Sequence, residues 1–180
     1  MRKTWLVFGF FLAVSLTGCA STSFEGYQAD GRYCFRISKR KVCTADPVPS
    51  VEAEAKAKQF QPLPDRQVVW LVRNAPLDPF GKVSVSVNGM KVEMLPFTVS
   101  RFELAPGSYQ IAATYRSNNV GDITATGIAG EQQFVEVFAD VGLFDTYFSL
   151  RAISNVEGRR KVSTGKLIAD VRSKDFAGRP

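Results

Sequence analysis

The stretch that decides the fold is KVSVSVNGMKVEML, residues 82–95. From Val83 to Val87, valines alternate with serines, so the apolar side chains of an extended strand all point to one face. Asn88 and Gly89 follow, and both tolerate the positive φ that a type I′ hairpin turn requires. The stretch therefore predicts a β-hairpin with one buried face.

Other segments of the chain also carry strand patterns. QVVWLVR (67–73) is apolar almost throughout, which is typical of a central strand buried on both faces. Further strands are predicted in VSRFEL (99–104, with Phe102 and Leu104 inward), APGSYQIAATY (105–115), EQQFVEVFADVG (131–142), TYFSLRAIS (146–154) and GKLIADV (165–171). Residues 117–130 read as a polar, glycine-rich loop and GRRK (158–161) as a turn. Residues 65–172 are thus predicted to form an all-β, antiparallel β-sandwich.

Two cysteines lie in GRYCFRISKRKVCTAD, residues 31–46. If Ser38-Lys39 is a two-residue turn, Cys34 lies opposite Cys43, and opposed Cα atoms can approach to about 4.5 Å, within disulfide reach. A metal site is the alternative, but two cysteines in a chain without histidine are a poor ligand set. Residues 32–46 are therefore expected to form a small disulfide-closed hairpin.

The segment between this hairpin and the sandwich contains a short predicted helix. PVPSVEAEAKAK (47–58) is rich in strong helix formers, and Ser50 is suited to cap its start. Prolines in FQPLPD (60–65) end it. Because the helix is polar on most faces, we expect residues 47–64 to link rather than pack, and residues 173–180 to form a tail.

The chain begins with a pattern typical of an export signal. Arg2 and Lys3 precede an apolar run that is too short to cross the ~20-residue span of a membrane. LTGC (16–19) resembles the lipobox of bacterial lipoproteins, and an ordinary secretion signal is the alternative. The resemblance implies removal of residues 1–18, acylation of Cys19 and a tether over residues 19–31. Since Ala20 rather than Asp follows Cys19, it also implies an outer-membrane protein facing the periplasm.

A second resemblance covers about residues 65–155. VSVSVNGMKVEMLPFTVSRFELAPGSYQIAATY (83–115) is similar to PEGA domains and to a related uncharacterised lipoprotein domain, in its Asn-Gly turn, valine-rich strands and Pro-Gly-x-Tyr turn. It implies an Ig-like or PEGA-like sandwich and says almost nothing about function. The cysteine hairpin and the long 117–130 segment depart from that pattern.

Charge and composition limit the function classes. Of 23 basic residues, Arg2 and Lys3 would leave with the signal, and the remaining 21 face 17 acidic ones, so nucleic acid is not an expected partner. Without histidine there is no imidazole base or Ser-His-Asp triad. DVGLFD, which carries Asp140 and Asp145, reads as a turn, and STGKL (163–167) lacks the spacing of a phosphate loop. We expect no enzyme activity, no cofactor and no metal site.

Two basic clusters, SKRK (38–41) and GRRK (158–161), are predicted to lie at hairpin tips. Such clusters usually only keep a turn solvated, but each can also contact anionic headgroups or polymer. The residues concerned are Lys39, Arg40 and Lys41 in the first cluster and Arg159, Arg160 and Lys161 in the second.

These observations favour a lipid-anchored, non-catalytic envelope lipoprotein. Its partners would be the membrane, through acylated Cys19, and either an envelope protein or peptidoglycan. The alternative is a lipid-anchored binder of a small ligand or glycan, and a hydrolase is disfavoured.

Overall fold

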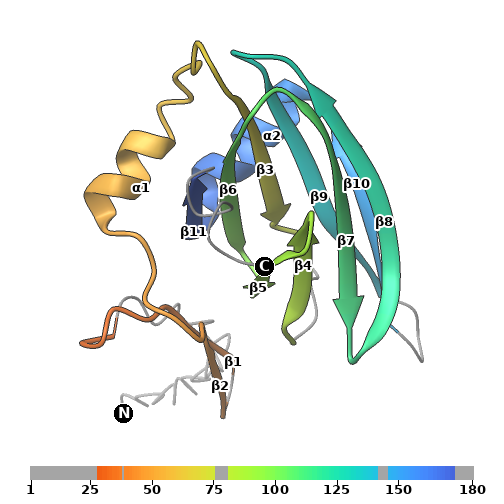
Figure 1. Cartoon of the computed structure of the whole chain (residues 1–180). Helices are drawn as coiled ribbons and strands as arrows, with labels where there is room; N and C mark the ends of the chain where they lie inside the picture. The colour runs from red at the N-terminus through yellow and green to blue at the C-terminus, as the bar shows by residue number, and fades with distance from the viewer. Residues whose placement is uncertain (1–27, 38, 76–80, 142–145, 173–180) are drawn as a thin grey trace, which may run out of the picture.

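The computed structural model describes residues 28–37, 39–75, 81–141 and 146–172. Two sheets stack face to face around one main core, as Figure 1 shows. The five-stranded sheet has the order β10-β9-β3-β6-β11, and the four-stranded sheet the order β5-β4-β7-β8. The strands of the first are β3 (Gln67–Arg73), β6 (Thr98–Leu104), β9 (Gln132–Val141), β10 (Thr146–Ile153) and β11 (Lys166–Arg172). Those of the second are β4 (Val83–Val87), β5 (Met90–Met94), β7 (Gly107–Tyr115) and β8 (Asn118–Gly127). The predicted all-β sandwich is confirmed.

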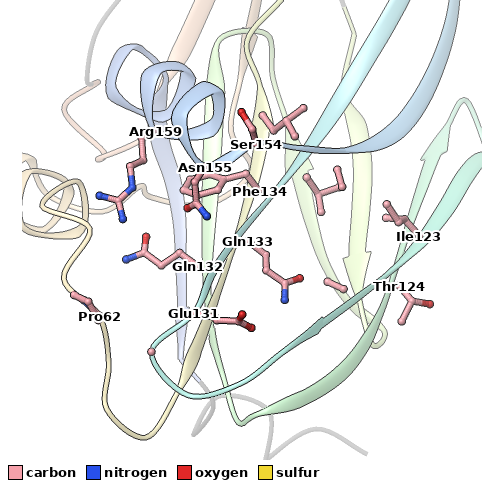
Figure 2. Close-up of a pocket in the computed structure, with 15 residues that line it drawn as sticks. Pro62, Ile123, Thr124, Glu131, Gln132, Gln133, Phe134, Ser154, Asn155 and Arg159 are labelled. Carbon is pink, nitrogen blue, oxygen red and sulfur yellow. The ribbon is translucent and has the colours of Figure 1, made fainter.

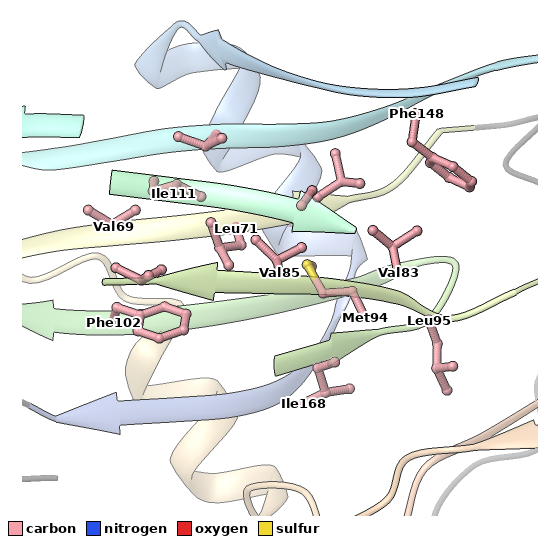
Figure 3. Packing of buried hydrophobic residues seen from close by; sticks show 14 of the residues in the cluster. Val69, Leu71, Val83, Val85, Met94, Leu95, Phe102, Ile111, Phe148 and Ile168 are labelled. Carbon is pink, nitrogen blue, oxygen red and sulfur yellow. The ribbon is translucent and has the colours of Figure 1, made fainter. Parts of the chain in front are cut away.

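The β4–β5 hairpin forms in the register that its sequence predicts. Val87 pairs with Met90, and the turn residues Asn88 and Gly89 have φ values of 44° and 86°. The three valines of β4 are completely buried in the main core, where Figure 3 labels Val83 and Val85, while the serines between them are partly exposed. Alternation and turn chemistry together therefore fix this hairpin.

The central strand β3 is buried along its whole length, as predicted. Val69 and Leu71 face the core between the sheets, whereas Val68, Trp70 and Val72 face a second cluster on the outer side. β3 is antiparallel to β6 but parallel to β9, and β11 is parallel to β6. A helix, α2 (Asn155–Thr164), connects β10 to β11 and packs over the outer cluster (Figure 1).

The prediction that GRRK forms a turn is wrong, because these residues lie within α2. The Ser154 side chain caps the helix by accepting a hydrogen bond from Glu157 N–H at 3.2 Å. Only Gly158, Lys161 and Val162 form its buried face, so the sequence carries no apolar stripe to reveal it. The buried Lys161 ammonium pairs with Glu136 of β9, whose carboxylate also binds Arg151 at 2.7 Å.

The prediction that residues 117–130 form a loop is also wrong for most of that segment. Residues 118–127 form β8, the edge strand of the four-stranded sheet, which pairs with β7 from Tyr115↔Asn118 to Gly107↔Gly127. A register shift between Ala113 and Thr114 bends this ladder. β8 is an exposed edge strand rich in short polar residues and glycine. Because these residue types are also typical of loops, its sequence resembles a loop.

The cysteine hairpin is confirmed. β1 (Cys34–Ile37) and β2 (Arg40–Cys43) pair with Cys34 opposite Cys43, and the disulfide joins Cα atoms 4.0 Å apart. Tyr33 and Phe35 are buried in the main core, and the Phe35 ring lies 5.7 Å from that of Phe97. The hairpin is therefore packed onto the sandwich.

The predicted helix forms as α1 (Val51–Ala57), with Ser50 as its cap. It packs rather than merely links, which corrects the expectation. Glu54 pairs with Lys166 of β11 and, at 2.7 Å, with Lys58, and it accepts a hydrogen bond from Leu167 N–H. Burial raises the pKa of Glu54, but these hydrogen bonds outweigh it and hold the pKa below its ordinary value of 4.5.

Candidate binding groove

A groove of about 620 Å³ opens at one edge of the five-stranded sheet (Figure 2). There the last residue of β10 stops two residues short of the first residue of its antiparallel neighbour β9. β10 pairs with β9 only as far as Ile153↔Phe134, and the chain then leaves the sheet at Ser154 to enter α2. The first two residues of β9, Gln132 and Gln133, pair with β3 on their other side. The β9 edge is therefore uncovered at this end of the sheet.

The strand register determines which backbone groups face the groove. Val68 N–H donates to Glu131 O at 2.9 Å, so the backbone polar groups of Glu131 point toward β3. Those of Gln133, two residues further along β9, point the same way. Successive residues of a strand direct their N–H and C=O groups to opposite neighbours. The N–H and C=O of Gln132 consequently point to the side that β10 has vacated.

The opposite wall of the groove is β8. Near Gly121 the two edge strands nearly touch, since a Cβ at Gly121 would lie 3.6 Å from Leu150 N. Beyond that contact Ile123, Thr124 and Ala125 line the groove, together with Ala152 of β10. The groove is thus the part of the sandwich edge that β8 and β10 leave open.

The lining combines an apolar floor with a polar rim. The apolar residues are Pro62, Ile123, Ala125, Phe134, Val135, Ala152 and Ile153. The polar side chains are Thr124, Glu131, Gln132, Gln133, Ser154, Asn155 and Arg159. Apolar pockets with a few polar groups at the edge are the usual composition of binding sites.

Several of the polar groups are already held by the protein. Gln132 Nε2 donates to Phe60 O at 2.7 Å, and its Oε1 accepts from Trp70 Nε1 at 3.3 Å. Gln133 Nε2 donates to Thr126 O, and Glu131 accepts from Ile128 N–H at 2.9 Å. These bonds fix the positions of Glu131, Gln132 and Gln133 in the wall of the groove.

The outer wall of the groove includes Phe134 and Arg159, which belong to an aromatic cluster built around Phe60. Its ring lies 5.5 Å from Trp70 and 6.2 Å from Phe134, and the Arg159 guanidinium stacks over it at 5.0 Å. Because Arg159 and Glu131 both line the groove and are exposed, its rim carries one positive and one negative charge.

The structure separates the two predicted basic clusters. Lys39, Arg40 and Lys41 are exposed on the cysteine hairpin. Arg159 and Arg160 are exposed on α2, whereas Lys161 is buried against Glu136 and cannot reach an external surface. Cys19 and Asp145 lie outside the described residues, and Asp140 pairs with Tyr147 inside the β9–β10 ladder.

Sequence reasoning did not identify the groove. Its residues come from five separate segments, and neither the pair Gln132-Gln133 nor Ser154-Asn155 has a motif that marks a site. β10 stops two residues short of the start of β9, and this offset becomes apparent only once the strand pairing is known.

Within the described segments, no group of three or more His, Cys, Asp or Glu residues is arranged to hold a metal ion. The same segments contain no helix of the length and hydrophobicity needed to span a membrane. No protein-family model and no curated protein matches the chain.

Proposed function

We propose that this protein is a lipid-anchored, non-catalytic envelope module that binds a protein partner. The groove takes an extended segment of that partner, which pairs with β9 where β10 has ended. Acylated Cys19 holds the module on the outer membrane, facing the periplasm. The observation that carries the proposal is the uncovered β9 edge at Gln132, which opens into the groove.

The physical argument rests on hydrogen bonding at a sheet edge. An exposed strand edge offers unpaired N–H and C=O groups, and an added strand can satisfy them while its alternate side chains enter neighbouring pockets. Here such a segment would continue the line of β10, with its apolar side chains over Ala125, Val135 and Ala152. A glycan, the alternative occupant, would depend on side-chain donors such as Thr124, Asn155 and Arg159, whereas Gln132 and Gln133 each already donate one hydrogen bond within the protein.

Photocrosslinking in living cells tests this function. A benzophenone side chain replaces Thr124, which lines the groove, or Thr114, an exposed threonine of β7 that is remote from it. We expect one discrete protein adduct from position 124 and none from position 114.

Two substitutions on β10 serve as a matched pair in the same assay. Ala152→Arg fills the groove and should abolish the adduct, whereas Ser149→Arg, exposed on the same strand but outside the groove, should leave it intact. An adduct that survives Ala152→Arg contradicts binding in the groove. No adduct, with a thermal shift caused by wall glycan fragments, would instead support the small-ligand alternative.

A further inference from the structure

The cysteine hairpin carries a net positive charge and a cluster of exposed basic side chains. Residues 28–46 carry five basic side chains and two acidic ones. Of the five, Lys39, Arg40 and Lys41 are consecutive and exposed. This hairpin is therefore one of two basic regions of the mature chain, and the other is residues 158–180, with seven basic and two acidic residues.

The chain toward Cys19 leaves the domain beside this cluster. Gln28 is the first described residue, and its side-chain oxygen accepts a hydrogen bond from Lys41 Nζ at 2.9 Å. Gln28 follows Cys19 by nine positions, and a fully extended chain spans at most about 3.6 Å per residue. The basic cluster is thus confined to within roughly 30 Å of any lipid attached to Cys19.

The hairpin and the groove lie at opposite ends of the central strand. Phe35 of the hairpin contacts Phe97, which precedes the residue that pairs with Arg73 at the end of β3. At the other end of the strand, Gly130 of the groove donates to Arg66 O at 2.8 Å. The seven residues of β3 separate the two by roughly 20 Å, and Figure 1 shows the hairpin below the sheets.

From these observations we infer that the hairpin cluster Lys39, Arg40 and Lys41 binds anionic lipid headgroups of the membrane that holds Cys19. The contact orients the domain so that the groove faces away from the lipid. Each Lys or Arg close to an anionic surface strengthens attachment by about fivefold, and a tether this short keeps the cluster near that surface. The inference rests on the lipid anchor of the proposed function, but it does not depend on what occupies the groove.

Lysine footprinting on vesicles tests the inference. The acylated mature protein is reconstituted into vesicles of phosphatidylethanolamine with phosphatidylglycerol, or into vesicles of phosphatidylcholine alone. Acetylation of Lys39 is followed by mass spectrometry, with exposed Lys56 of α1 as the internal reference. On the anionic vesicles, Lys39 should be labelled about fivefold more slowly than on the neutral ones, and high salt should remove the difference.

Two charge reversals provide the matched comparison. Arg40→Glu on the hairpin should abolish the protection of Lys39, whereas Arg160→Glu, an exposed arginine on α2, should preserve it. Equal labelling of Lys39 on both vesicle types, in protein that floats with the vesicles, would overturn the inference alone. Protein that does not float would overturn the lipid anchor and the inference together.

Discussion

At the scale of single residues, Gly158 controls how closely α2 approaches the sheet. It is buried in the helix, and a Cβ at this position would overlap the Phe134 ring, whose other neighbours include Phe60. Since Phe134 also lines the groove, this close approach fixes the outer wall as well as the helix. Glycine lowers the intrinsic stability of the helix, but the close packing of α2 against Phe134 that it allows offsets this cost.

We therefore expect Gly158→Ala to destabilise the protein although alanine is the better helix former. Overpacking of this kind costs about 1–3 kcal/mol in the free energy of unfolding, which denaturant titration measures. Val156→Ala changes an exposed residue of the same helix and should shift that free energy by no more than about 0.5 kcal/mol. Unchanged or increased stability of Gly158→Ala would contradict the packing argument.

At the scale of elements, the cysteine hairpin is held both by its disulfide and by the sandwich. The bond closes a loop with a sequence separation of 9, and Tyr33 and Phe35 pack into the main core. The second contact does not depend on the bond, so reduction should loosen the hairpin without unfolding the domain.

Reduction should lower the free energy of unfolding by about 2–3 kcal/mol, the chain-entropy value for so short a loop. A thermal melt with and without reductant measures the shift, and thiol titration should find Cys34 and Cys43 unreactive before reduction. The double variant Cys34→Ala/Cys43→Ala should melt at the same temperature in both conditions. Loss of all cooperative unfolding on reduction would show that the sandwich depends on the bond.

Elements with strong local chemistry could be predicted from the sequence, and those stabilised by distant contacts could not. The Asn88-Gly89 turn fixes the β4–β5 register, and the cysteine spacing fixes the hairpin. By contrast, α2 depends on the Lys161–Glu136 pair and on Gly158, which no periodicity reveals. The β8 sequence resembles a loop because its ladder partner β7 supplies the pairing.

At the scale of the whole molecule, the groove follows from topology rather than from any one segment. β10 and β8 are the edge strands on the same side of the sandwich, and they close it only as far as Gly121. The exit of the chain into α2 at Ser154 then leaves the start of β9 uncovered. The disulfide hairpin lies at the far end, so the proposed lipid-facing and partner-binding surfaces lie at opposite ends of the sandwich.

Hydrogen exchange at two adjacent amides tests the open edge most directly. The Gln133 N–H points toward β3 and should exchange slowly in the protein alone, whereas the Gln132 N–H points into the groove and should exchange quickly. In the complex with the crosslinked partner, Gln132 should become as protected as Gln133. Strong protection of Gln132 in the isolated protein, or no change in the complex, would contradict strand addition at β9.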